Sequence, residues 1–256
     1  MIKFVKPDYS KLKTKGYQCV DMHFHTVHSD GSSTVNEILN KSRKYGFGIA
    51  IADHNEINGY LEADAKKQKN DFIIPAIETQ SMEGIDVLFY FYTKKEIVDF
   101  FEKEIIPNRY KKGIRIKSKI PLKNLIELKN KYNCITSLAH PYGYELRSGK
   151  SNIIGNYPVV LTVDLIEAIN GGNIRQQNLR AIDLIKKHNK NYTAGSDAHS
   201  IENVGRIVTV TKAKTVKEFL DNIKNGKSDV IGTEAIGGKL FASVLWIKNQ
   251  ILRFIK

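Results

Sequence analysis

Residues 19–33, CVDMHFHTVHSDGSS, join a short apolar segment to several side chains of the types that bind metal ions. The apolar segment over residues 19–22 predicts a buried β-strand. His23 and His25 follow it at positions i and i+2, and Asp30 lies five residues further on. Because side chains alternate between the faces of a strand, both imidazoles should point to the same side at its carboxyl end. The pair predicts a metal chelate, although two surface histidines would give the same HxH pattern.

Comparable side chains follow other strand-like segments of the chain. The segments over residues 48–53, 72–77, 134–138 and 192–194 are each followed by one or two of these side chains, namely His54, Glu78, His140, and Asp197 with His199. Segments with helical spacing lie between the strands, as over residues 34–45, where Thr34 and Glu37 form a capping-box pattern. Such alternation is typical of βα units around a parallel sheet. In βα barrels the carboxyl ends of the strands converge on the active site, so we expect these side chains to meet there.

The donor set combines imidazoles with carboxylates and includes no paired thiols, which suits zinc, manganese or iron. It contains more ligands than one tetrahedral ion needs. We therefore expect two or three divalent ions that share a carboxylate, with Glu78 as the bridge. Two ions about 3.5–4 Å apart can activate a water molecule and stabilise a leaving oxygen, and a phosphate ester suits this arrangement. No serine or cysteine lies in a nucleophile-elbow pattern, so the predicted nucleophile is a metal-bound hydroxide.

Five motifs, in chain order, resemble those of the polymerase and histidinol phosphatase (PHP) superfamily: HFHTVHSDGS at 23–32, IADHN at 51–55, PAIE at 75–78, AHP at 139–141 and GSDAH at 195–199. The resemblance spans residues 19–210, and it is strongest to the small metal-dependent phosphoesterase branch. It implies a TIM-like fold, a distorted (β/α)7 barrel, with three metal ions at one site.

The resemblance also implies a ligand set for each ion. One ion would be held by His23, His25, Glu78 and Asp197; a second by Asp30, His54 and His199; and a third would be shared by Glu78 and His140. Relatives often have a histidine before the strand that follows the glutamate, whereas this chain has Asp86 at that position. Aspartate can also bind a metal, so the third ion would depend on this replacement.

The length of 256 residues allows one large domain or two small ones. The resemblance implies a single PHP domain over residues 1–256 with its core over residues 19–233, and the spacing of apolar residues predicts an amphipathic helix over 239–256. That helix would dock on the barrel or contact a membrane surface or a second copy. No apolar run reaches the about 18 residues that a membrane span needs, and the charged N-terminus does not resemble an export signal. We expect Cys19 and Cys134 to be buried thiols, which favours the cytoplasm.

The net charge of +13 predicts an anionic partner, unless it reflects a general richness in lysine. Arginine is suited to phosphate, and Arg175, Arg147 and Arg206 are candidates in that order, with surface charges as the alternative. We predict an enzyme that hydrolyses a phosphate monoester of a small metabolite or nucleotide. The alternatives are a nuclease that trims RNA or DNA ends, suggested by the basic stretch 109–119, a histidinol-phosphate phosphatase, and a metal-binding regulatory protein without activity.

Overall fold

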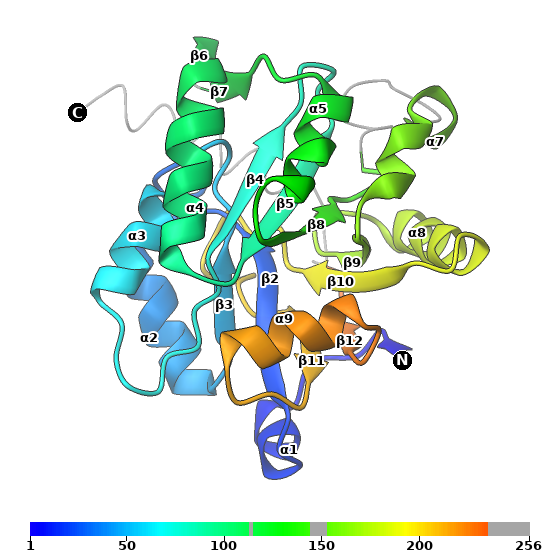
Figure 1. Ribbon diagram of the computed structural model, residues 1–256. Helices are drawn as coiled ribbons and strands as arrows, with labels where there is room; N and C mark the ends of the chain where they lie inside the picture. The colour runs from blue at the N-terminus through cyan, green and yellow to red at the C-terminus, as the bar shows by residue number, and fades with distance from the viewer. Residues whose placement is uncertain (113–114, 144–152, 235–256) are drawn as a thin grey trace.

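The structure is a computed structural model that describes residues 1–112, 115–143 and 153–234 (Figure 1). Its strands are β1 (Ile2–Lys3), β2 (Gln18–Phe24), β3 (Gly48–Ile51), β4 (Ala76–Gln80), β5 (Asp86–Phe91), β6 (Arg109–Lys112), β7 (Arg115–Ser118), β8 (Cys134–Leu138), β9 (Leu165–Asn170), β10 (Asn191–Gly195), β11 (Ile207–Thr211) and β12 (Asp229–Gly232). Its helices are α1 (Tyr9–Thr14), α2 (Val35–Tyr45), α3 (Asn58–Ala65), α4 (Lys94–Phe100), α5 (Leu122–Glu127), α7 (Ile153–Asn156), α8 (Arg175–Lys187) and α9 (Val216–Lys224).

The strands form two five-stranded sheets and a separate hairpin. The strand orders are β1-β12-β11-β2-β3 and β10-β9-β8-β5-β4, and β6 pairs with β7. β2 with β3, β8 with β9, and β9 with β10 are parallel pairs, as βα units require. β5 instead runs antiparallel to both β4 and β8, because only a short turn separates β4 from β5 and such a turn reverses the chain.

The two sheets approach each other through single bridges rather than through continuous ladders. His54 bridges to Glu78, Ile49 to Ile73 and Phe24 to Ala198. The predicted mixed α/β fold is confirmed. The predicted distorted (β/α)7 barrel is found only in part, because the hydrogen-bonded sheets of the described residues do not close into a barrel. The bridges nevertheless bring the ends of β2, β3, β4 and β10 side by side.

Burial explains why most residues of the central strands are apolar. Every residue of β3, β5, β8 and β9 is buried, since helices pack on the outside of the strands: α3 lies against β3, α4 against β5 and α8 against β9. Helix α2 begins with the predicted capping box, in which Thr34 accepts from the Glu37 backbone and Glu37 from that of Thr34. Each cap satisfies backbone groups that a helix end leaves without partners.

Several elements differ from their prediction. His23 lies inside β2 and Glu78 inside β4, where we expected both residues to follow the strand. The basic stretch around residue 113 forms the β6–β7 hairpin, for which no strands were predicted. The predicted helix over 239–256 lies outside the described residues, and the domain limits stay a prediction. Within the described residues, none of the helices is both long enough and apolar enough to cross a membrane.

The carboxyl end of β10 packs closely against β2 at Gly195. A Cβ atom at Gly195 would lie 2.4 Å from Cβ of His23 and 2.6 Å from its backbone nitrogen. Two residues after Gly195, the Asp197 backbone N–H donates to the His23 carbonyl over 2.7 Å. The glycine therefore lets the two strands approach at the point where both carry predicted ligands.

We expect Gly195→Ala to lower the free energy of unfolding by about 1–3 kcal/mol, the usual cost of overpacking a close contact. Urea denaturation of the variant and the parent protein measures this difference. An unchanged midpoint and slope would contradict the close approach of β10 to β2.

Candidate metal centre

The eight predicted metal ligands meet at one end of the strands. His23 lies in β2 and Glu78 in β4. The other predicted ligands follow the ends of strands: His25 and Asp30 come after β2, His54 after β3, His140 after β8, and Asp197 with His199 after β10. Three groups of side chains have ligand atoms within 4.8 Å of one another: His25, Asp30, His54 and His199; His23, His25 and Glu78; and His54, Glu78 and Asp86. The fold therefore brings together positions that lie up to 176 residues apart (199 − 23) in the chain.

Glu78 lies between four imidazoles. Its Oε1 atom is 3.3 Å from Nε2 of His23 and 3.2 Å from Nε2 of His140. Its Oε2 atom is 2.9 Å from Nδ1 of His54 and 3.5 Å from Nε2 of His25. Each carboxylate oxygen thus faces two ring nitrogens, as expected of a carboxylate that bridges two cations.

Asp30 forms a second centre of contacts. Its Oδ1 atom is 3.3 Å from Nε2 of His199 and 3.9 Å from Nδ1 of His25, and its Oδ2 atom is 3.7 Å from Nε2 of His54. The two nitrogens of His25 therefore face different carboxylates, since Nε2 points toward Glu78. His25 and His54 connect the two centres.

Asp197 and Asp86 lie on either side of this cluster. Oδ1 of Asp197 is 3.2 Å from Nε2 of His25 and 3.8 Å from Nε2 of His23. Oδ2 of Asp86 is 4.0 Å from Nε2 of His140, and Asp86 forms a possible ligand group with His54 and Glu78. Asp86 therefore occupies a place from which it can act as a ligand where relatives have histidine.

Burial and neighbouring charges perturb the pKa values of the cluster strongly. Burial, with help from His199 and His54, lowers the pKa of His25 to about 4. Burial also opposes a charge on His54, but Glu78 and Asp30 outweigh it and raise the pKa of His54 to about 10. Burial opposes a charge on Glu78 as well, and its histidine neighbours His54 and His23 still hold its pKa well below the usual range. The carboxylates thus require positive charge close by, from protons or from cations.

The donor set fits divalent cations. His23 Nε2 and His25 Nδ1 are buried and form no hydrogen bond with any described residue. Leaving a buried polar atom without a partner costs about 1–3 kcal/mol, and metal coordination satisfies such nitrogens. Imidazoles and carboxylates without thiols suit zinc, manganese or iron.

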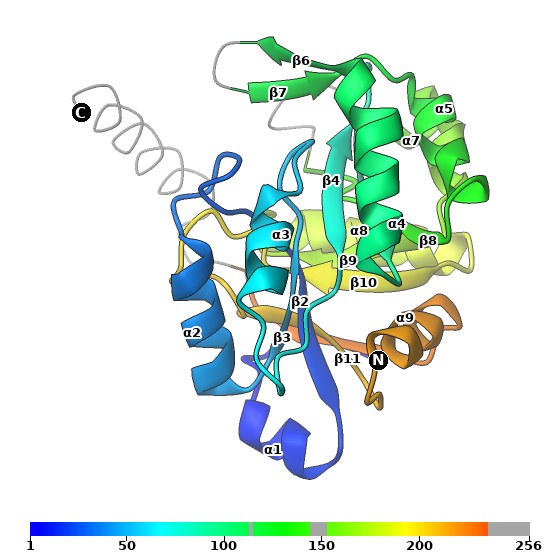
Figure 2. The same ribbon diagram turned by 60° about the vertical axis from the view of Figure 1, so that its left-hand side comes forward.

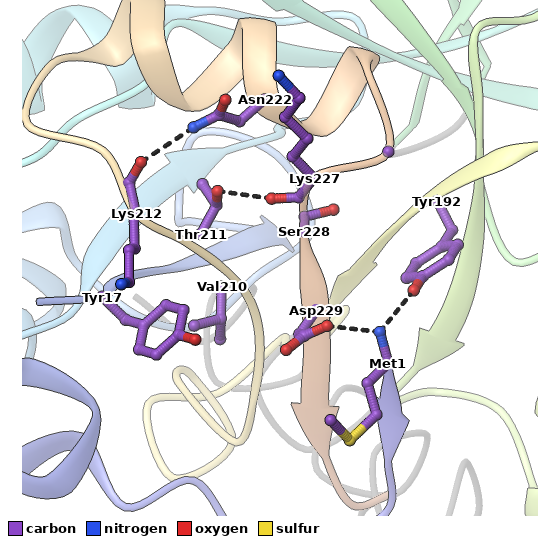
Figure 3. Close-up of a pocket in the computed structure, with 11 residues that line it drawn as sticks. Met1, Tyr17, Tyr192, Val210, Thr211, Lys212, Asn222, Lys227, Ser228 and Asp229 are labelled. Carbon is purple, nitrogen blue, oxygen red and sulfur yellow. Dashed lines mark hydrogen bonds and ion pairs between the residues drawn. The ribbon is translucent and has the colours of Figure 1, made fainter. Parts of the chain in front are cut away.

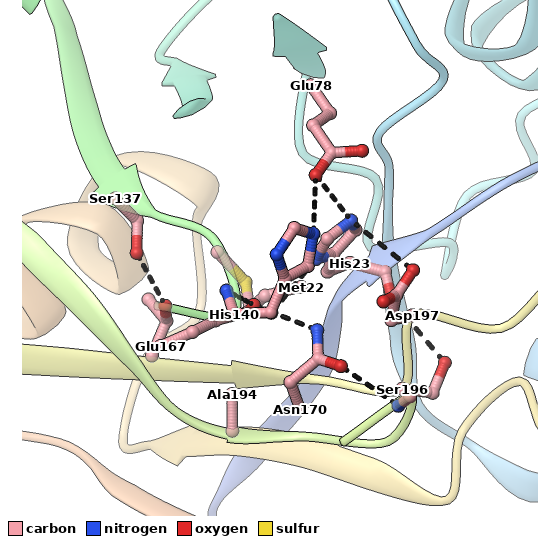
Figure 4. A network of polar contacts seen from close by, with 12 residues as sticks. Met22, His23, Glu78, Ser137, His140, Glu167, Asn170, Ala194, Ser196 and Asp197 are labelled. Carbon is pink, nitrogen blue, oxygen red and sulfur yellow. Dashed lines mark hydrogen bonds and ion pairs between the residues drawn. The ribbon is translucent and has the colours of Figure 1, made fainter. Parts of the chain in front are cut away.

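Glu167 holds one of the ligands in place, and the sequence analysis missed it. Its Oε1 atom is 3.0 Å from Nδ1 of His23, and its Oε2 atom accepts from the His140 backbone N–H at 2.8 Å and from Asn170 Nδ2 at 2.9 Å. Figure 4 shows Glu167 on the side of His23 away from Glu78. Such a carboxylate fixes which ring nitrogen faces the metal. Its position in the buried strand LIEAIN was the only available signal, a charge inside an apolar run.

Asp21 positions the segment that carries Asp197. It accepts hydrogen bonds from the Ser196 backbone and hydroxyl, at 2.9 and 2.6 Å, and from the Gly205 N–H at 2.7 Å. Burial raises the pKa of Asp21 to about 6, although these hydrogen bonds oppose the shift. The loop after β10 is thereby tied to the strand that carries His23.

The backbone is strained at this centre. Four described residues other than glycine have positive φ angles: Asn55, His140, Asn189 and Asp197. His140 and Asp197 are predicted ligands, and Asn55 follows the ligand His54. Such angles cost about 1–3 kcal/mol each and are concentrated at functional sites.

The structure gives the candidate arginines different surroundings. The Arg175 guanidinium donates to both carboxylate oxygens of Glu234, at 2.7 and 2.9 Å, and lies 3.8 Å from the ring centroid of Phe4. Arg206 donates to the Glu234 carbonyl. Arg147 lies outside the described residues. A role for these side chains in phosphate binding stays a prediction.

A separate pocket of about 520 Å³ lies beside β10, β11 and β12 (Figure 3). Met1, Tyr192 and Asp229 lie together at its edge, where the Met1 amino group donates to the Tyr192 hydroxyl at 2.9 Å. None of the predicted ligands lines this pocket. This pocket is therefore separate from the candidate metal centre.

Comparisons with known proteins agree with this picture. The family described as PHP-associated matches residues 175–228. A putative metal-dependent phosphoesterase from Bifidobacterium adolescentis has a similar structure (TM-score 0.55, 20% identity, 76% of this chain and 89% of that chain covered). A two-domain protein from Bacteroides vulgatus that contains a predicted PHP-like metal-dependent phosphoesterase is also similar. The TM-score is 0.61 at 15% identity, and the match covers 90% of this chain and 68% of that protein.

The lesion-specific endonuclease EndoQ from Pyrococcus furiosus is a third similar structure (TM-score 0.65, 19% identity). The match covers 84% of this chain but only 57% of the endonuclease, so this chain spans little more than half of that protein. At these identities the likeness shows a shared fold. A search of curated proteins finds no match to this sequence.

We expect Glu167→Gln to weaken metal binding by about 10- to 100-fold, because it removes the charge that orients His23. Titration calorimetry with zinc or manganese on protein stripped by a chelator measures the affinity. Thermal melting with and without metal gives a second readout. Glu127→Gln, a change at a carboxylate that is 55% exposed, serves as the matched control. Equal affinities for the two variants would contradict the positioning role.

Proposed function

We propose that this chain, a member of the PHP superfamily, is a metal-dependent phosphoesterase that hydrolyses a phosphate monoester of a small metabolite or nucleotide. One observation carries the proposal: the buried Glu78 carboxylate faces four imidazoles, two at each oxygen. A buried carboxylate that shares its space with Asp197 and Asp30 is costly unless the imidazoles are protonated or cations lie between the groups.

The residues on each side of Glu78 would hold two or three divalent ions. His23, His25, Glu78 and Asp197 would hold one; Asp30, His54 and His199 a second; and His140 with Glu78 and Asp86 a third. When bound, such ions would activate a water molecule for attack on phosphorus and neutralise the phosphate oxygens. Zinc, manganese and iron all suit these ligands.

The protein's own groups prepare this chemistry. Glu167 accepts from Nδ1 of His23 and so keeps Nε2 of that ring directed at Glu78. Asp21 and Gly195 fix the approach of β10 to β2, and with it the distance between Asp197 and the two histidines of β2. Because these contacts are buried, the ligands are positioned before any substrate arrives.

Phosphate recognition would fall to Arg175 and Arg147, whose guanidinium groups match two phosphate oxygens. Arg175 is half exposed and held by Glu234, an ion pair that an incoming phosphate would have to replace. The buried thiols Cys19 and Cys134 suit a reducing compartment, and we propose the cytoplasm.

A nuclease is the second candidate. A structural neighbour acts as a lesion-specific endonuclease, and the basic β6–β7 hairpin of this chain lies near the metal centre. Hydrolysis of histidinol phosphate is a narrower version of the first candidate. A regulatory protein without activity would have little physical reason to keep so many buried ionisable groups together.

We expect purified protein loaded with manganese or zinc to release phosphate from members of a panel of phosphomonoesters that includes nucleotides and histidinol phosphate. Glu78→Gln should lower the rate by about 100-fold or more, because it removes the central charge of the site. Glu127→Gln, which removes an exposed carboxylate, should leave the rate unchanged. Phosphate release measured by a colorimetric assay gives the result.

Two outcomes would contradict the proposal. One is the absence of turnover with every metal and substrate, including oligonucleotides. The other is a Glu78→Gln variant as active as the parent protein. Elemental analysis showing fewer than two ions per chain, together with inactivity, would favour the regulatory alternative.

A further inference from the structure

The β6–β7 hairpin is attached to the loop that carries the ligand His54. Asn55, the next residue, donates from Nδ2 to the Ile116 carbonyl at 2.9 Å. Glu56 forms an ion pair with Arg109 at 3.1 Å. β7 also lies against β4, the strand of Glu78, and Figure 2 shows the hairpin above the carboxyl end of that strand. The hairpin is therefore fixed beside the metal centre.

The hairpin carries charge of a single sign. Six of the eleven residues from 109 to 119 are lysine or arginine, and none is acidic. Arg109 is paired with Glu56, whereas Lys111, Lys117 and Lys119 form no ion pair with a described residue. On the helices, Lys95 and Lys123 each face an acidic partner one turn away, whereas the exposed Lys11, Lys13 and Lys44 form no ion pair with a described residue. What distinguishes the unpaired lysines of the hairpin is therefore their place beside the metal centre.

An exposed aromatic ring lies among these charges. Tyr110 is 39% exposed and pairs across the hairpin with Lys117. The Lys119 ammonium lies 5.8 Å from the centroid of the Tyr110 ring. Basic side chains beside an aromatic ring match the two features of a nucleic-acid strand, because the cations contact phosphates and the ring stacks on an unpaired base.

We propose that the β6–β7 hairpin binds single-stranded nucleic acid and leads its phosphate backbone to the metal centre. The proposal rests on the metal-dependent phosphoesterase chemistry of the proposed function and favours its second candidate, the nuclease, because it makes an oligonucleotide the molecule that bears the hydrolysed ester. A small metabolite offers too few phosphates to contact several lysines at once. An exposed tyrosine stacks more readily on the bases of a single strand, which are not enclosed in a duplex.

Binding is measured by the fluorescence anisotropy of a labelled twelve-nucleotide single strand with the full chain in a chelating buffer, so that no hydrolysis occurs. We expect Tyr110→Ala to weaken binding by about 5- to 150-fold, the range for loss of one stacked base. Combining Lys111→Gln, Lys117→Gln and Lys119→Gln should reduce the slope of log affinity against log salt by about 2.

A charge-matched control separates the hairpin from general electrostatics. Lys95→Gln, Lys123→Gln and Lys186→Gln together change the net charge equally at side chains that are 72–85% exposed. This control should bind the strand as the parent protein does. Thermal melting verifies that every variant is folded.

Three results would overturn the hairpin proposal: no binding of the strand, an equal loss in the control, or tighter binding of a duplex than of the single strand. Hydrolysis of a small phosphomonoester by the parent protein is measured separately. If that ester is hydrolysed but no strand binds, the hairpin proposal alone fails. If the strand binds through the hairpin but no ester of any kind is hydrolysed, the phosphoesterase proposal alone fails.

Discussion

The structure depends on the need to compensate the buried negative charge of Glu78. A carboxylate inside a protein requires opposite charge or hydrogen bonds, because water no longer solvates it. Here four imidazoles from three different parts of the chain surround it. The imidazoles can surround Glu78 only if the fold brings the strand ends to within a few ångströms of one another. The arrangement of the site therefore depends on the arrangement of the strands.

The surroundings of Glu78 show how the fold meets that need. Glu167 and Asp21 do not face the space where ions would lie; each is a buried carboxylate that orients a ligand or the segment carrying one. The positive φ angles at Asn55, His140 and Asp197 aim side chains that a regular strand would direct elsewhere. The strain and the buried charge are concentrated in one region, and the apolar strands behind it provide the stability that offsets their cost.

The sequence predicted the composition of the site better than the course of the chain. The eight candidate ligands could be proposed because strand ends converge and because imidazoles and carboxylates recur there, and the structure brings all eight side chains together, while metal binding by them stays a prediction. Glu167 was missed because it lies within an apolar strand rather than at its end. The sequence did not predict that β5 runs antiparallel to its neighbours. The alternation of side chains along a strand is the same for parallel and antiparallel pairing, so only the short turn before β5 could have indicated its direction. Strands β6 and β7 were not predicted because most of their residues are basic, whereas the apolar residues of a buried strand are the usual signal.

Crystallographic anomalous scattering from protein grown with zinc or manganese would test the central claim most directly. The account predicts two or three anomalous peaks between Glu78 and the surrounding imidazoles, with the Glu78 carboxylate in contact with at least two of the ions. Peaks found only elsewhere on the molecule, with Glu78 bonded to protonated histidines alone, would contradict it.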